Sequence, residues 1–115
     1  SVSFEIPENE LMKFDFIPGQ YLTVILDING KEERRSYSIC STPYESLRIG
    51  VKEVDKGIVS GYINKTLAVG DEILISHPEG NFKLLKNSGN YVAFAAGSGI
   101  TPILSIAKTI AKNFF

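Results

Sequence analysis

A guanidinium, a phenol and a hydroxyl occur within four residues in the stretch Arg34–Ser41, which reads RRSYSICS. In a β-strand, alternation would place Arg35 and Tyr37 on one face, and neither face would be a clean apolar surface. An arginine can bind phosphate through two parallel hydrogen bonds, and a tyrosine can lie against a planar ring. Ser38 can hydrogen-bond a ring heteroatom. These residue types suit a ligand with a flat aromatic part and a phosphate part, whereas an ordinary solvent-facing strand explains any isolated R-x-Y-S.

A second candidate is the stretch GSGITP at Gly97–Pro102. The two glycines permit tight backbone geometry and close approach of a ligand, and Thr101 and Pro102 suit an N-cap and a first helical position. The free amides of a helix N-terminus attract phosphate. Because Pro102 stands where a third glycine would be, this is not the G-x-G-x-x-G fingerprint, and a plain strand-to-helix turn is the alternative.

A third candidate is DKGIVSGYIN, in which Gly57 and Ser60 open a predicted helix next to Lys56. Free N–H groups, a hydroxyl and a cation again fit phosphate. The alternative is a capping helix that begins with a flexible glycine.

Short apolar runs separated by turn signals must position these stretches. The predicted strands are Val2–Ile6, Tyr21–Ile28, Arg34–Cys40, Leu47–Val54 and Glu72–Ser76. Asn29-Gly30 is a strong hairpin signal, and Val59, Ile63 and Leu67 predict one helical face over Gly57–Leu67. Short strands at this spacing favour a closed antiparallel barrel or a sandwich.

The pattern changes near residues 86–90. Asn90–Ala96 reads as a compact apolar strand, and a helical stripe then follows at Ile103, Ile106, Ala107 and Ile110. A strand, a glycine-rich turn and a helix are the start of a parallel α/β unit. Since one strand and one helix cannot form a parallel sheet, we expect a domain boundary here and a chain that stops inside its second domain. The opening SVSFEI, already in mid-pattern, predicts that the front is clipped as well.

Composition narrows the classes of function. The 115 residues are 43% hydrophobic and 22% charged, which is ordinary for a globular chain. The single cysteine, Cys40, excludes an intramolecular disulfide and a cysteine-ligated zinc or iron–sulfur site. No apolar run approaches a membrane span and no signal peptide opens the chain, so we expect a cytoplasmic protein with no membrane partner. A net charge of −1 argues against nucleic acid as a partner.

Five short motifs occur in one order at compatible spacings: RRSYSICS, IGVK at Ile49–Lys52, GIVS at Gly57–Ser60, PEGNF at Pro78–Phe82, and GSGITP. In this order they resemble the ferredoxin–NADP⁺ reductase superfamily. The likeness is greatest to the reductase components of bacterial multicomponent oxygenases, of the phenylacetate-degradation type. It covers nearly the whole chain.

The resemblance implies a mainly β fold. Residues 1–86 would form a six-stranded antiparallel Greek-key barrel that binds FAD and carries one capping helix. Residues 87–115 would be the first strand, loop and helix of a truncated NAD(P)-binding α/β domain. The protein would be an NAD(P)H-dependent flavoprotein reductase.

The resemblance also implies roles for individual residues. Arg35 would bind the FAD pyrophosphate, Tyr37 would pack against the isoalloxazine ring, and Ser38 would hydrogen-bond near its N5. The other implied cofactor-binding residues are Ser36, Ile49, Val51, Lys52, Gly57, Ile58, Val59, Ser60 and Thr101. The nicotinamide nucleotide would contact Gly97, Ser98, Gly99, Ile100, Thr101 and Pro102, with Thr101 near the flavin. No metal ligand and no acid–base pair is expected in the chain.

Electrons would pass from NADH or NADPH through FAD to an iron–sulfur centre, a ferredoxin-type protein or an oxygenase acceptor. A [2Fe–2S] cluster would belong to a missing domain or a partner. Two alternatives stay open from the residues: a small β-barrel binding module without flavin, and a truncated, inactive reductase fragment.

Overall fold

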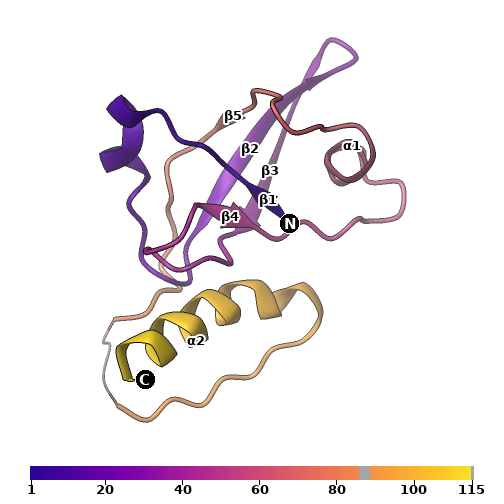
Figure 1. The fold of residues 1–115 in the computed structure, drawn as a ribbon. Helices are drawn as coiled ribbons and strands as arrows, with labels where there is room; N and C mark the ends of the chain where they lie inside the picture. The colour runs from indigo at the N-terminus through magenta and orange to yellow at the C-terminus, as the bar shows by residue number, and fades with distance from the viewer. Residues whose placement is uncertain (86–88, 115) are drawn as a thin grey trace.

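The computed structural model of the chain describes residues 1–85 and 89–114. The expected boundary at residues 86–90 lies largely outside them. In chain order the elements are β1 (Val2–Ser3), η1 (Glu8–Phe14), β2 (Tyr21–Ile28), β3 (Lys31–Ser38), β4 (Arg48–Ile49), α1 (Ile58–Lys65), β5 (Leu74–Ile75), η2 (Gly97–Gly99) and α2 (Ile100–Phe114). Figure 1 shows the β2–β3 hairpin extending away from α2, with η1 and α1 to either side of it.

The hairpin confirms the signal at Asn29-Gly30. These two residues have φ angles of 54° and 79°, the left-handed values that a two-residue turn of this kind needs. The Gly30 N–H donates to Oδ1 of Asp27 at 2.9 Å, and Ile28 pairs with Lys31 across the turn. This turn fixes the register of the whole β2–β3 ladder.

The described strands form two open sheets. One has the order β3-β2-β5, the other pairs β1 with β4, and both are antiparallel. An isolated bridge between Ile39 and Ile49 links them. The fold is mainly β, but the six-stranded closed barrel is not confirmed, because regular pairing is limited to two residues in each of β1, β4 and β5. Beyond β1, for example, single bonds such as Phe4 N–H to the Leu47 carbonyl (2.8 Å) replace a ladder.

The core lies between the sheets and α1. Its buried residues are Leu22, Val24, Leu26, Ile39, Leu47, Ile49, Val59 and Ile63. Helix α1 buries Val59 and Ile63, which confirms two positions of the predicted face. The helix ends at Lys65, and Leu67 packs against the core from beyond its end. Burial of this apolar surface is the main force that holds the short strands together.

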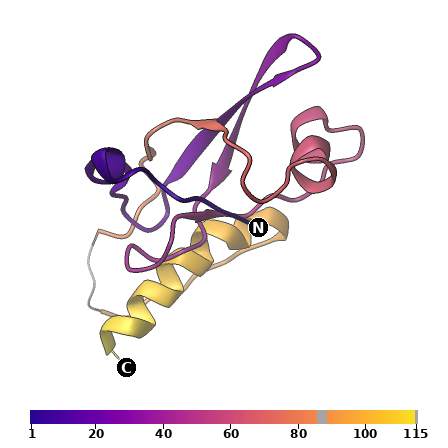
Figure 2. The same cartoon turned by 45° about the horizontal axis from the view of Figure 1, so that its top comes forward.

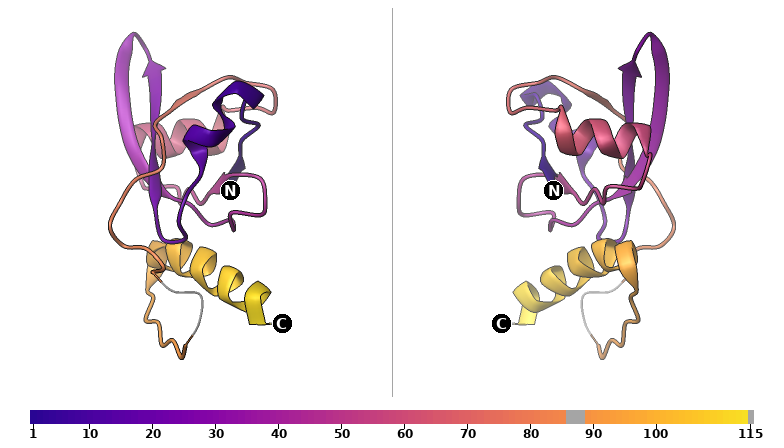
Figure 3. Two further views of the ribbon diagram at one scale, coloured as in Figure 1. Left: turned by 90° about the vertical axis from the view of Figure 1, so that its left-hand side faces the viewer. Right: turned by 90° about the vertical axis from the view of Figure 1, so that its right-hand side faces the viewer.

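The last described segment differs from the expected strand and helix. Asn90–Ala96 forms no strand, because no neighbouring strand pairs with it among the described residues. Thr101 is not the N-cap: the glycines tighten into η2, so that α2 begins at Ile100, two residues before the expected first helical position at Pro102. In Figures 2 and 3, α2 crosses the end of the β-layer opposite the hairpin tip.

The face of α2 that meets the β-layer is polar. Ser105 and Thr109 are its buried residues, whereas in the expected apolar stripe Ile103, Ile106 and Ile110 are partly buried and Ala107 is exposed. Neither helix in the described part of the chain has the length and apolar character needed to span a membrane.

Candidate functional site

The strand register explains how polar side chains reach the inner face of β3. Tyr37 lies opposite Leu22 and Arg35 opposite Val24, and both β2 residues are fully buried. Directly opposed residues in an antiparallel pair project to the same side of the sheet. Arg35 and Tyr37 therefore lie on the same side of the sheet as the core residues of β2. The rest of the protein leaves this strip of β3 partly exposed.

The guanidinium of Arg35 is anchored at one nitrogen. Nη1 donates to the carbonyl of Arg34 at 2.7 Å and to Oε2 of Glu33 at 3.4 Å. Within the described residues, no protein group accepts a hydrogen bond from its Nε or Nη2, and the side chain is half exposed. The Nε–Nη2 edge is therefore available for bidentate binding of a phosphate group.

Tyr37 presents a neutral aromatic ring beside this arginine. Burial raises the pKa of its phenol above the usual value, and the Arg35 guanidinium offsets part of the rise. The phenol therefore stays protonated at neutral pH. A half-buried, uncharged ring next to a free guanidinium edge fits a ligand that joins a planar ring system to a phosphate.

Ser38 and Thr101 are brought together through Gly50. The Gly50 N–H donates to the Ser38 carbonyl at 3.4 Å. On its other side Gly50 faces Thr101 so closely that a Cβ added to the glycine would lie 2.9 Å from Thr101 Cγ2. Ser38 and Thr101 were named as site residues from the sequence, whereas Gly50 was included only as part of the IGVK motif and had no role of its own.

The start of α1 supplies backbone groups rather than a hydroxyl. Its N-cap residue, Gly57, makes no side-chain cap, so the N–H groups of the first turn remain available to a ligand. Ser60 is buried, and its Oγ accepts a hydrogen bond from the Val54 N–H at 3.0 Å. The predicted phosphate contact of the Ser60 hydroxyl thus competes with a structural bond. Ile58, next to Gly57, is exposed.

Several other predicted residues lie off this face. Ser36 projects to the opposite side of β3, where its hydroxyl lies 3.1 Å from that of Thr23. Ile49 and Val59 are in the core and can offer a ligand only backbone groups. The remaining ones divide into the partly buried Val51 and Pro102 and the exposed Lys52, Gly97, Ser98, Gly99 and Ile100.

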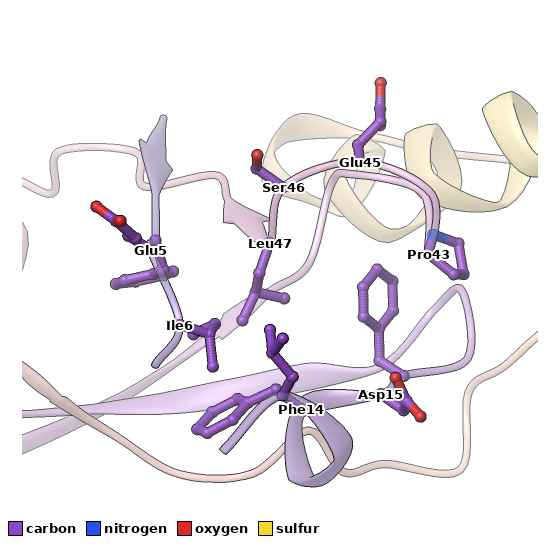
Figure 4. Close-up of a pocket in the computed structure, with 11 residues that line it drawn as sticks. Glu5, Ile6, Phe14, Asp15, Pro43, Glu45, Ser46 and Leu47 are labelled. Atoms are coloured by element: carbon purple, nitrogen blue, oxygen red, sulfur yellow. The ribbon is translucent and has the colours of Figure 1, made fainter. Parts of the chain in front are cut away.

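A cavity of about 430 Å³ lies elsewhere in the molecule (Figure 4). Its lining residues are Phe4, Glu5, Ile6, Leu11, Phe14, Asp15, Phe16, Pro43, Glu45, Ser46 and Leu47. None of the predicted cofactor-binding residues is among them. Three carboxylates line this cavity, so it is a poor place for a phosphate. The predicted ligand site is the open strip on β3.

The contacts that seat α2 were not predicted from the sequence. Lys108 Nζ donates to both carboxylate oxygens of Glu45, at 2.7 and 2.8 Å. These bonds, with a further one from the Thr42 N–H, lower the pKa of Glu45 from 4.5 to about 2. Ser105 Oγ donates to the Ser41 carbonyl at 2.6 Å. Residues 63 or 64 positions apart form these bonds, so no local pattern could reveal them.

Comparison with known proteins gives a consistent family. Residues 1–84 match the family described as "Oxidoreductase FAD-binding domain". The chain is 36% identical over 114 residues to one of the subunits of 1,2-phenylacetyl-CoA epoxidase from Escherichia coli strain K12, covering 95% of this chain and 32% of that protein. It thus spans about a third of the length of this curated relative.

Solved structures of two reductases superimpose on this chain. A cytochrome P450 reductase from Amycolatopsis, GcoB, superimposes with a TM-score of 0.72 at 29% identity, over 84% of this chain and 31% of that one. The ferredoxin-NADP⁺ reductase from Plasmodium falciparum with 2'P-AMP gives a TM-score of 0.68 at 30% identity, over 84% and 41%. The overlap extends over most of the described residues, so the open sheets belong to a known cofactor-binding fold.

Proposed function

This chain belongs to the oxidoreductase FAD-binding domain family, and on that basis we propose that it binds FAD on the inner face of β3 and carries electrons from NADH or NADPH. The observation that carries the proposal is the free Nε–Nη2 edge of Arg35 beside the neutral, half-buried ring of Tyr37. These two side chains fit the phosphate and ring parts of a flavin dinucleotide.

Each residue of the strip has a distinct task. The free edge of Arg35 binds the pyrophosphate and Tyr37 packs against the isoalloxazine. Ser38, whose side chain alternates to the other face of β3, hydrogen-bonds near the isoalloxazine N5 from the end of the strand. The first-turn N–H groups of α1, from Ile58 onward, approach the pyrophosphate as a helix N-terminus does, whereas the Gly57 N–H donates to the Val54 carbonyl at 2.8 Å. When bound, FAD supplies the redox chemistry, and the protein orients it and tunes it by hydrogen bonds.

We propose two domains. Residues 1–86 form the FAD-binding unit, a six-stranded Greek-key barrel in its complete form, and residues 87–115 begin an NAD(P)-binding α/β unit. In support, Val92 and Phe94 are 84% and 93% exposed, and in an extended segment they share a face that neighbouring strands of a sheet could bury. Thr101, at the start of α2, lies close to Ser38 through Gly50, where a nicotinamide would have to meet the flavin.

The electron acceptor follows from the relatives. The Escherichia coli relative is part of an epoxidase, and the Amycolatopsis protein is a cytochrome P450 reductase. We propose that this protein likewise serves an oxygenase system in the cytoplasm, delivering electrons to an iron–sulfur centre on another domain or to a ferredoxin-type partner.

The first experiment is an equilibrium titration of the purified chain with FAD, followed by flavin fluorescence. Arg35→Ala should weaken FAD binding by about 10- to 100-fold, the loss expected for a charge-assisted hydrogen bond. Arg34→Ala is the matched control, because Arg34 lies on the opposite face of β3 and pairs with Glu32. It should change the affinity by less than about threefold. Equal losses in both variants would contradict the proposed site.

Electron transfer needs its own test. Anaerobic addition of NADH, and separately NADPH, to the FAD-loaded chain should bleach the flavin absorption if residues 87–115 suffice to bring the nucleotide to the flavin. Bound FAD that neither nucleotide reduces would limit the function of this chain to flavin binding.

A further inference from the structure

Glu33 is a buried carboxylate beside the arginine that the proposed function assigns to phosphate. Its side chain is 10% exposed and projects from β3 opposite Leu26, on the same face as Arg35. Oε2 lies 3.4 Å from Arg35 Nη1, and Oε1 lies 3.6 Å from Lys31 Nζ. The three side chains form a row along the strand with the carboxylate in the middle.

This position is an unusual one for a glutamate. Its cross-strand neighbour, Leu26, belongs to the apolar core, and an apolar side chain opposite it would be buried at lower cost. Buried ion pairs seldom add net stability over well-packed apolar residues. A role in holding Arg35 explains the residue better than a role in stability.

The contacts define what such a role would be. Glu33 and the Arg34 carbonyl both bind Nη1, and they fix the guanidinium from that side. The opposite edge, Nε and Nη2, is then presented in one orientation. We propose that Glu33 is a positioning residue that holds Arg35 ready for the pyrophosphate of FAD; this inference rests on the proposed function. Fixing the arginine before the ligand arrives removes part of the ordering cost of binding.

The negative charge of Glu33 is compatible with a phosphate site at Arg35. A carboxylate next to a phosphate site repels the ligand, but Lys31 neutralises the second oxygen of Glu33. The row of Lys31, Glu33 and Arg35 keeps one net positive charge. The pyrophosphate therefore meets a cationic strip with a fixed guanidinium.

The chain offers a matched pair of variants for the test. Glu33→Gln removes the charge that anchors Arg35 and keeps the shape. Glu32→Gln makes the same change on the opposite face, where the exposed Glu32 binds Arg34 at 2.7 Å. Each protein is titrated with FAD and with riboflavin, which has the ring system but no phosphate.

If Glu33 acts through Arg35, Glu33→Gln weakens FAD binding by about fivefold to tenfold and leaves riboflavin binding within about twofold. Glu32→Gln leaves both affinities within about twofold. In an Arg35→Ala background, Glu33→Gln has no further effect on FAD, because the group that it positions is gone. Glu33→Asp keeps the charge on a shorter side chain. It should weaken FAD binding by about threefold and leave riboflavin binding unchanged.

Three results would contradict the positioning role of Glu33, and each has a different meaning. Equal losses for FAD and riboflavin would make Glu33 a structural residue, and tighter FAD binding would make it a competitor of the pyrophosphate. Either outcome, or wild-type behaviour of the variants, overturns the inference. If Glu33→Gln does not fold, the Glu33→Asp titrations decide in the same way. A loss in Arg35→Ala without one in Glu33→Gln overturns this inference alone, whereas a wild-type chain that binds no FAD overturns the proposed function too.

Discussion

At the scale of single residues, the site is a place where polar side chains project from the core face of a sheet. Glu33, Arg35 and Tyr37 lie opposite Leu26, Val24 and Leu22, respectively. The apolar residues of β2 are buried, but the residues facing them on β3 include a half-exposed guanidinium and a half-buried ring. A sheet face with buried apolar residues on β2 and partly exposed polar groups on β3 is suited to a ligand that covers those polar groups.

The ring of Tyr37 gives a prediction that differs from that for Arg35. Tyr37→Ala should weaken the binding of both FAD and riboflavin by about tenfold, because both ligands carry the ring against which Tyr37 packs. Tyr37→Phe keeps the packing and should change either affinity by less than about threefold. The measurement is the same fluorescence titration. A loss confined to FAD would place Tyr37 at the phosphate part of the ligand and contradict its assignment.

Residue-level prediction succeeded where alternation determines a face. The spacing of Arg35 and Tyr37 places them together as soon as β3 is recognised as a strand, and the structure has them on one face. Glu33 could not be found this way, because a run of five charged residues, Lys31–Arg35, is typical of a solvated surface. Its burial depends on the opposing Leu26 and the core beneath, which only the folded chain brings together.

At the scale of elements, α2 is held by polar contacts rather than by an apolar stripe. The Glu45–Lys108 ion pair and the bond from Ser105 to the Ser41 carbonyl connect it to the loop before β4. A cation–π contact adds to them, since Lys112 Nζ lies 4.5 Å from the centre of the Tyr44 ring. The buried Ser105 and Thr109 are not members of the apolar stripe read from the sequence, because apolar periodicity cannot indicate polar residues that become buried.

The Glu45 carboxylate gives a pH prediction. Its pKa in the folded chain is lowered to about 2 by the bonds from Lys108 and Thr42, so an unfolded chain takes up the proton first as the pH falls. The ion pair's contribution to stability is therefore complete above about pH 4.5 and is lost between there and pH 2. For a pair exposed by more than a third, we expect about 0.5 kcal/mol.

Urea denaturation at several pH values in this range measures the effect. Glu45→Gln should remove this part of the pH dependence, Lys108→Met should remove the larger share of it and leave the share of the Thr42 bond, and the double variant should remove no more than Glu45→Gln. Acid sensitivity that is unchanged in both single variants would show that the pair does not hold α2 in solution.

At the scale of the whole molecule, stability rests on a small core between two open sheets. Leu22, Ile39 and Ile49 are its largest fully buried residues, and they come from three separate parts of the chain. The core is also the support of the site, because Leu22 lies opposite Tyr37. Loss of core packing should therefore lower stability and flavin affinity together.

Leu22→Ala should lower the free energy of unfolding by about 2–5 kcal/mol, the range for deleting a buried leucine side chain. Leu74→Ala is the control, because Leu74 is 64% exposed, and it should cost about 0.5 kcal/mol or less. Urea denaturation monitored by circular dichroism distinguishes them. Similar costs for the two variants would mean that the β2 face is not the centre of the core.

Whole-molecule features were predictable only in part. The hairpin, the α1 face and the mainly β class follow from turn residues and local periodicity, and the structure confirms each of them. Strand length and sheet closure do not follow, because they depend on which distant segments pair. Asn90–Ala96 shows the limit most clearly: its apolar composition predicts a strand, but strand formation also requires a neighbour.

Binding of FAD along the β3 strip is tested most directly by a map of backbone amide chemical shifts during an FAD titration. The shift changes should cluster at Arg35, Tyr37 and Ser38 and at the first turn of α1. The cavity between η1 and the loop before β4, around Phe14 and Leu47, should stay unperturbed. Changes centred on that cavity, or none at all, would contradict FAD binding on β3.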